Sequence, residues 1–249
     1  MITDDDIQGH WVREWIKAPG FEDHTTAVHW IQVGADYADI RVPLDRPDLD
    51  GANCLAELPA ASLSMLAAAE GFAGHTVLEG SRCTWHREIN WHGAPEGADI
   101  GALSFDSSGS MIEEGVEAEY TELWHPRKTA PGQAVRVAGA GYVGFLLTRG
   151  TAFVLGIGRP NAPPMQSVRD ELCMGHIPDS TAHLFDGLHA YGHWTGTEAI
   201  ARLATQPFSE GRIVARRSGT GLIWNAIGFD GSEREIVLSA QEMVDDISL

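Results

Sequence analysis

Charged and aromatic side chains alternate at every second position in four short stretches of the first half of the chain. The stretches are Trp11-x-Arg13-x-Trp15, Tyr37-x-Asp39-x-Arg41, Trp85-x-Arg87-x-Ile89-x-Trp91 and Tyr120-x-Glu122-x-Trp124. Residues two apart lie on one face of a β-strand, so each stretch predicts a strand that mixes rings with charges. Because ring burial dominates core energetics, we expect this face to turn inward. Unpaired buried charge is costly, so the interior must be a self-neutralised network or a pocket for a polar ligand.

Short strands separated by turn residues are expected along the whole chain. In the first half they are predicted at residues 9–17, 25–33, 36–42, 75–79, 82–91, 99–105, 110–115 and 118–124. In the second half they are predicted near residues 134–138, 141–148, 151–157, 182–194, 199–204, 212–216, 222–227 and 234–238. Helices are predicted over residues 61–70 and 165–173. Many short strands favour a barrel or a sandwich over βαβ units, so the predicted class is all-β and mainly antiparallel.

The length of the chain allows one large all-β unit or two domains. The 249 residues would divide into halves of a common domain size. Proline and glycine punctuate the stretch from His125-Pro126 to Pro131-Gly132, which therefore predicts an interdomain connection. We expect one domain at residues 1–126 and a second at residues 133–249.

The charge and the cysteines narrow the choice of partners. The formal net charge of −18 argues against binding to nucleic acid or to anionic membrane surfaces. Cys54, Cys83 and Cys173 are widely separated and lack CxxC spacing, which argues against a disulfide scaffold or a zinc module. No charged-then-apolar leader follows Met1, and no apolar run is long enough for a membrane helix. We therefore expect a cytoplasmic protein with reduced thiols.

Several longer motifs resemble one family. They are Gly9-His10-Trp11-x-Arg13, Thr25-Thr26-x-Val28-x-Trp30-Ile31-Gln32, Tyr37-Ala38-Asp39-Ile40-Arg41-Val42-Pro43, Gly71-Phe72-Ala73-Gly74-His75-Thr76, Cys83-x-Trp85-His86-Arg87-Glu88 and Met111-Ile112-Glu113-Glu114-Gly115. Gly9-x-Trp11 is similar to the first strand of lipocalins and calycins. Together the motifs resemble the bacterial relatives of the fungal casein-kinase-interacting protein Hri, over residues 9–125. The segment from Thr205 to Gly211 resembles a diverged piece of the same family. The resemblance implies two lipocalin-like β-barrel lobes and no agreed chemistry.

Alternation assigns a set of polar residues to the interior of the first lobe. The set is Arg13, Gln32, Asp39, Arg41, Arg87, Glu114 and Glu122. Arginine forks match carboxylates in two-bond geometry, so these groups can neutralise one another. Alternatively, some of the arginines, best Arg87 and Arg41, bind the carboxylate of a small molecule between apolar walls. The predicted ligand-binding residues are Arg87, Arg41, Arg13, Trp85, Trp91, Trp30, Gln32 and Trp124.

Three functions remain open on this evidence. The first is a lipocalin-like binder of a small anionic molecule with an aromatic or unsaturated body. The second is a cofactor-free isomerase or lyase that uses Glu122, Asp39 and Tyr120 for proton transfer in the same cavity. The third is a protein-interaction module. The sequence names neither the ligand, nor a reaction, nor the oligomeric state.

No metal or cofactor is predicted. The His86-x-Glu88 pair is interpreted as a polar strand surface, because no His-x-His pair accompanies it. The motif Gly156-x-Gly158 lacks the third glycine of a dinucleotide fingerprint. In the second half, His189-x-Tyr191-x-His193 shares one strand face and is expected to line the second lobe.

Overall fold

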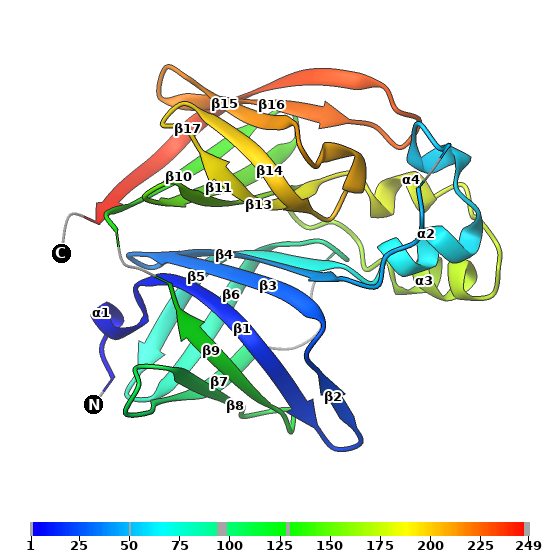
Figure 1. Ribbon diagram of the computed structural model, residues 1–249. Helices are drawn as coiled ribbons and strands as arrows, with labels where there is room; N and C mark the ends of the chain where they lie inside the picture. Colours follow the sequence, from blue (N-terminus) through cyan, green and yellow to red (C-terminus); the bar gives the residue numbers. More distant parts are fainter. Residues whose placement is uncertain (1, 50, 94–98, 128–129, 247–249) are drawn as a thin grey trace.

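Two β-barrels pack against each other through their outer walls (Figure 1). The computed structural model describes residues 2–49, 51–93, 99–127 and 130–246. All strand pairings in the described parts are antiparallel, and the double barrel confirms the predicted all-β class. No helix in these parts is both long and apolar enough to span a membrane.

The first barrel contains strands β1 to β9. Their bounds are β1 (Gly9–Ala18), β2 (Phe21–Asp23), β3 (Thr26–Val33), β4 (Asp36–Pro43), β5 (Glu70–Glu79), β6 (Arg82–Asn90), β7 (Asp99–Phe105), β8 (Met111–Gly115) and β9 (Thr121–Pro126). The sheet order is β2-β1-β3-β4-β5-β6-β7-β8-β9, and pairing of β1 with β9 closes the ring. The short strand β2 pairs only with the end of β1, beyond the part of β1 that pairs with β3.

The second barrel is formed by strands β10 to β17, which close in sequence order. Their bounds are β10 (Gly132–Gly139), β11 (Tyr142–Arg149), β12 (Ala152–Gly158), β13 (Leu188–Trp194), β14 (Glu198–Ala204), β15 (Ile213–Ser218), β16 (Gly221–Ile227) and β17 (Glu233–Asp246). Its interior is an apolar core that includes Phe153, Leu155, Leu188 and Trp224.

The wall between the barrels is also apolar. Ile31, Ile40 and Ala73 of the first barrel pack against Phe145 and Val154 of the second. Strands β3, β4, β11 and β12 are therefore buried on both faces over much of their length. This explains why apolar residues run almost without interruption through β11 and β12.

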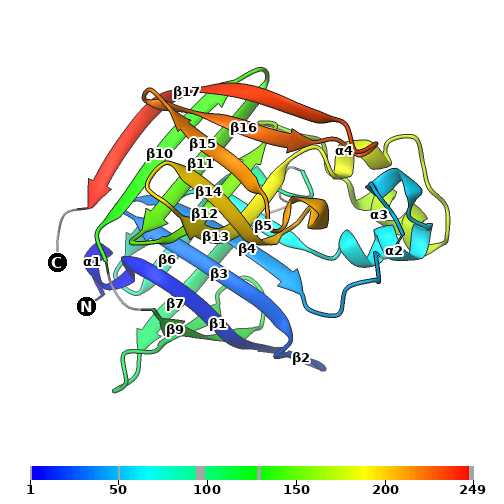
Figure 2. The same cartoon turned by 45° about the horizontal axis from the view of Figure 1, so that its top comes forward.

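Short helices close the two ends of the molecule (Figure 2). At one end, α2 (Ala60–Leu66), α3 (Gln166–Cys173) and α4 (Thr181–Leu184) form a cap with an apolar core of their own. At the other end, α1 (Asp4–Ile7) buries Ile7 in the first barrel. Two 3-10 turns, η1 (Leu55–Glu57) and η2 (Pro207–Ser209), complete the described elements.

The helix boundaries differ in part from the sequence predictions. The predicted helix at 61–70 ends at Leu66, because the chain enters β5 at Glu70. The predicted strand at 182–194 is wrong in its first part, since residues 181–184 form α4 and β13 begins at Leu188. The four-residue helices α1 and α4 are too short to produce a periodic signal.

Two β-bulges redirect aromatic side chains that alternation assigned to the interior. In β1 the register shifts between Arg13 and Trp15, and Trp15 ends half-buried beside Lys17, whose Nζ lies 4.8 Å from the ring centroid. In β6 the register shifts between Arg87 and Ile89, opposite Ala73 and Gly74. A bulge inserts one residue and reverses the facing of the residues beyond it in the strand. Ile89 therefore packs in the wall between the barrels, and Trp91 packs with the helical cap.

Candidate functional site

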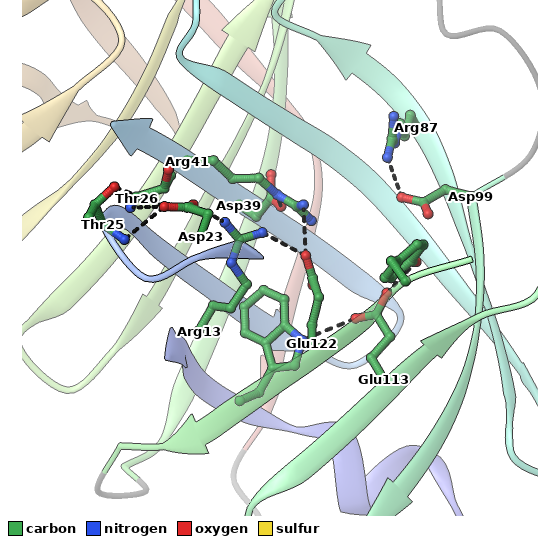
Figure 3. Close-up of polar contacts among 12 residues, drawn as sticks. Arg13, Asp23, Thr25, Thr26, Asp39, Arg41, Arg87, Asp99, Glu113 and Glu122 are labelled. Carbon is green, nitrogen blue, oxygen red and sulfur yellow. Dashed lines mark hydrogen bonds and ion pairs between the residues drawn. The ribbon is translucent and has the colours of Figure 1, made fainter. Parts of the chain in front are cut away.

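Arginine and acid side chains gather inside the first barrel, and we refer to them together as the polar lattice (Figure 3). Its arginines are Arg13, Arg41 and Arg87, and its acids are Asp23, Asp39, Asp99, Glu113 and Glu122. Arg13 donates from Nη1 to Glu122 Oε1 at 2.6 Å and from Nη2 to Asp23 Oδ2 at 3.3 Å. Arg41 donates from Nε to Asp39 Oδ2 at 2.9 Å and from Nη1 to Glu122 Oε1 at 3.4 Å. Glu122 thus joins two arginines.

Asp39 is fixed by groups from two strands. Besides the bond from Arg41, its Oδ1 accepts a hydrogen bond from the backbone N–H of Phe72 at 2.8 Å. Burial raises the pKa of Asp39, and the nearby Arg41 only partly opposes this. The pKa of Arg41 lies well above its ordinary value, because Asp39 and Glu122 outweigh the opposing effect of burial. The pair is a structural ion pair held by its neighbours.

Arg87 lies on β6, near the start of β7. It forms an ion pair with Asp99, and the side chains are 19% and 21% exposed. Its guanidinium carbon sits 3.6 Å from the centroid of the Phe72 ring, a cation–π contact. Its buried Nε has no hydrogen-bond partner among the described residues. Every arginine of the lattice therefore has an acid partner, but Arg87 keeps part of its fork unused.

Glu113 belongs to the lattice in place of the expected Glu114. Tyr120 donates from its hydroxyl to Glu113 Oε1 at 2.8 Å, and Trp124 donates from Nε1 to Oε2 at 3.2 Å. Burial, followed by the charge of Glu122, raises the pKa of Glu113 to about 8. Glu113 is the direct cross-strand partner of Glu122, and Glu114 is exposed. The assignment of Glu114 to the interior was wrong because this five-residue strand follows a turn that sets its facing.

The remaining predicted side chains pack between these charges. Trp30 meets Trp85 and Trp124 edge-on, with ring centroids 5.8 and 5.7 Å apart. Gln32 accepts a hydrogen bond from Trp30 Nε1 at 3.2 Å and donates to Thr76 Oγ1 at 2.8 Å. The space left among these rings and acids is about 10 Å³. This volume holds about one water molecule, so the pocket among these side chains has no room for a larger ligand.

A larger cavity, of about 370 Å³, lies between the barrels beneath the helical cap. We refer to it as the inter-barrel cavity. Its apolar walls are Ile89 and Trp91 at the end of β6, Ile157 and Gly158 at the end of β12, and Met165 and Leu184 from the cap, and its polar lining residues are Asn90, Arg159, His183, Asp186 and His189. A mostly apolar cavity with a few polar groups is the usual form of a small-molecule site.

Two buried polar atoms of this lining have no partner among the described residues. They are Trp91 Nε1 and His189 Nε2. Burial lowers the pKa of His189 to about 4, so its imidazole is neutral near pH 7. The predicted face of His189 and Tyr191 does not line the second barrel. It faces outward, since Leu188 and Ala190 occupy the interior and Tyr191 stacks on His29 of the first barrel, with centroids 3.5 Å apart.

A smaller depression adjoins the cavity at its rim. Asn90, Gly93, Arg159 and Ala162 line both, and Arg87 lines the depression as well. Arg159 donates from Nε to Asp186 Oδ2 at 2.6 Å and from Nη2 to the Tyr142 hydroxyl at 2.9 Å. Arginines from both barrels therefore border the same depression.

The part of the chain that the structure describes contains no cluster of side chains suited to bind a metal ion. No group of at least three His, Cys, Asp or Glu side chains is placed there to hold an ion. His86 stacks on His75, with centroids 4.7 Å apart, and His75 Nδ1 lies 3.1 Å from Glu88 Oε1.

Comparisons with known proteins support the fold. Neither a protein-family model nor a curated protein matches the sequence. Among solved structures, the chain is similar to an uncharacterised protein of Saccharomyces cerevisiae, YLR301w, with a TM-score of 0.57 and 11% sequence identity. The superposition covers 94% of this chain and 98% of the yeast chain. At this identity the likeness concerns the fold alone, and the double β-barrel is what the two proteins share.

Proposed function

We propose that this protein binds a small molecule with an aromatic or unsaturated body and a carboxylate, and that the body occupies the inter-barrel cavity. The observation that carries the proposal is the 370 Å³ cavity with largely apolar walls and unpartnered polar atoms on Trp91 and His189. Burial of an apolar ligand surface there would supply affinity, and the polar atoms would orient the ligand.

The carboxylate is assigned to the depression between Arg87 and Arg159. Nη1 of each arginine has no partner among the described residues, since Arg87 uses Nη2 and Arg159 uses Nε and Nη2. Glu88 also borders the depression, but its Oε1 contacts His75 Nδ1 at 3.1 Å and Arg136 Nη1 at 3.5 Å. Each arginine therefore has a terminal nitrogen left for a charge-assisted hydrogen bond, so these groups suit an anionic end.

This proposal keeps the ligand class expected from the sequence and moves its site. Within the first barrel, each lattice arginine has an acid partner, and the free space is about 10 Å³. A substrate would have no room beside Glu122, Asp39 and Tyr120. We therefore favour a ligand-binding function over a cofactor-free isomerase or lyase. The protein-interaction role and the cytoplasmic location stay predictions from the sequence.

We also propose the limits of two domains and a relationship of the chain to the Hri proteins. We propose residues 1–126 and 133–249 as two domains, since strands of the first barrel end at Pro126 and those of the second begin at Gly132. Relationship to the Hri proteins is supported by the motifs within residues 9–125 and by the double-barrel fold.

Isothermal titration calorimetry with naphthalene-1-carboxylate tests the binding proposal. Ala162 lines both the cavity and the depression, so Ala162→Trp should abolish binding by filling the entrance. Ala68→Trp, on an exposed position outside the cavity, is the matched control and should bind as the natural protein does. Arg159→Gln should weaken binding by about 10-fold or more. Equal binding by the Ala162→Trp variant, or failure of every bicyclic carboxylate of this kind to bind, would refute the proposed site.

A further inference from the structure

We infer that the deep end of the inter-barrel cavity recognises a planar group with a hydrogen-bond donor beside an acceptor, such as a ring lactam, and that His189 and Trp91 read this pair. The inference rests on the proposed binding function and names the ligand chemistry more narrowly. It is carried by the arrangement of two side chains whose buried polar atoms have no partner in the described chain.

The contact of His189 with the first barrel fixes the position of its proton. His189 Nδ1 lies 3.2 Å from the backbone carbonyl oxygen of Asp39. A carbonyl oxygen only accepts, so Nδ1 carries the hydrogen. In a neutral imidazole the other nitrogen then has a lone pair and no hydrogen. His189 Nε2 is therefore an acceptor that requires a donor.

Two glycines determine which edge of the imidazole is enclosed by the two barrels. A Cβ atom on Gly71 would lie 2.2 Å from His189 Cγ and 2.5 Å from Nδ1, and one on Gly156 would lie 2.9 Å from Cε1. The Nδ1–Cε1 edge is thus enclosed between a strand of each barrel. The opposite edge carries Nε2, and His189 meets Trp91 in an edge-to-face contact, with centroids 6.4 Å apart and planes at 84°.

Trp91 supplies the complementary group. An indole Nε1–H only donates, so two touching lining residues bring one unpartnered donor and one unpartnered acceptor to the same part of the cavity wall. Leaving either group unpaired in a buried site is costly. A carboxylate offers acceptors alone and would leave His189 Nε2 without a donor. A ring lactam satisfies both groups, because its N–H can donate to His189 while its carbonyl accepts from Trp91.

The two ends of the site therefore favour different chemical groups of a ligand. The deep end has apolar neighbours such as Ile89, Ile157 and Met165, which disfavour a charge. The rim has Arg87 and Arg159, which favour an anion. A flat bicyclic molecule with a lactam at one end and a carboxylate at the other fits both requirements.

Three bicyclic probes separate these contributions in isothermal titration calorimetry. They are 2-oxo-1,2-dihydroquinoline-4-carboxylate, its N-methyl derivative, and naphthalene-1-carboxylate. The lactam should bind about 10-fold or more tightly than the other two, because only it can donate to His189 while accepting from Trp91. In Trp91→Phe, which keeps a ring but removes the N–H, the ratio of the lactam affinity to the naphthalene-1-carboxylate affinity should shrink by about 10-fold.

The outcomes distinguish the inference from the function on which it rests. Equal affinity for all three probes overturns the lactam assignment and leaves the binding function standing. Absence of binding by every probe overturns both. Because His189 variants can misfold, its role is read by nitrogen-15 NMR of the imidazole in the natural protein. We expect a neutral ring protonated on Nδ1, and a shift of the Nε2 resonance with the lactam that the N-methyl derivative does not cause.

Discussion

His189 of the second barrel donates a hydrogen bond from Nδ1 to the main-chain carbonyl of Asp39 in the first barrel, 3.2 Å away. The carboxylate of Asp39 faces the other way, into the polar lattice, where it binds Arg41. One residue of β4 thus contacts both the lattice and the lining of the inter-barrel cavity. The position of His189 depends on this bond and on the two glycines that enclose its ring.

Replacement of Gly71 by alanine should destabilise the protein. The new Cβ would lie 2.2 Å from His189 Cγ, in a wall where both barrels are tightly packed. We expect Gly71→Ala to lower the free energy of unfolding by about 1–3 kcal/mol, the usual cost of overpacking. Urea denaturation measures this loss. The double variant Gly71→Ala/His189→Ala should recover part of it, and an additive further loss would show that the clash is not the cause.

Glu122 should contribute strongly to stability. Its Oε1 contacts Arg13 at 2.6 Å and Arg41 at 3.4 Å, in a buried setting. Removing one partner of a buried ion pair leaves charge uncompensated, so Glu122→Gln should cost about 3 kcal/mol in the free energy of unfolding. The control is Glu114→Gln on the exposed face of β8, which should change stability by less than about 0.5 kcal/mol. Similar effects of the two variants in urea denaturation would contradict the lattice.

Glu113 should make the protein less stable as the pH rises. Burial raises its pKa from 4.5 to about 8 in the folded state, so the folded protein keeps a proton that the unfolded chain releases between these values. This contribution is fully present below pH 4.5 and is lost as the pH rises through about 8. The slope is at most about 1.4 kcal/mol per pH unit.

The variant Glu113→Gln isolates this contribution. The amide stays neutral at every pH, and the hydroxyl of Tyr120 can accept from it instead of donating. Urea denaturation between pH 5 and pH 9 should therefore give a flatter dependence on pH than in the natural protein. An unchanged dependence would mean that Glu113 is already ionised in the fold.

The buried pair His10 and His29 should act in the opposite direction at acid pH. His10 Nε2 and His29 Nδ1 are 3.0 Å apart, and burial, with the charge of Arg127, lowers their pKa values to about 4 and about 3. The unfolded chain binds protons at the ordinary value of 6.5, so stability is present above this pH and is lost as the pH falls toward 4.

Substitution of His29 tests the acid effect. His29→Phe keeps a ring on Tyr191, where the imidazole now stacks at 3.5 Å, and should reduce the loss of stability between pH 6.5 and pH 4. The expected reduction is up to about 1.4 kcal/mol per pH unit, measured by urea denaturation. His24→Gln, at an exposed position, is the control. Equal acid sensitivity of the His29→Phe variant would remove this pair as its source.

The period of two in the sequence was sufficient to predict strands and the facing of several charges. Arg13, Asp39 and Glu122 lie inside the first barrel as alternation predicts, because facing along an uninterrupted strand is a local property. Strand spacing predicted an all-β barrel or sandwich, and the resemblance to the Hri proteins implied two barrel lobes. The structure confirms the all-β class and the double barrel.

Errors arose where facing depends on a bulge or on a turn. Trp85 and Trp91 are an even number of residues apart, so alternation places them on the same face. Because of the bulge in β6, Trp91 instead lines the inter-barrel cavity. No residue pattern in β6 marks this bulge. Gly74 on the partner strand is its nearest sign, since a Cβ there would lie 1.9 Å from the His86 carbonyl oxygen. Glu113 and Glu114 are adjacent acids, and only closure of the preceding turn selects which one is buried.

Local alternation was enough to predict most of the strands and the charged interior of the first barrel. Two features came from tertiary packing instead: each arginine of the lattice has an acid partner, and a cavity of about 370 Å³ lies between the barrels. His189, Trp91 and Arg159 come from different parts of the chain, and they line one site because two closed barrels pack wall to wall. Packing of this kind depends on the shapes of whole surfaces, which no local pattern records.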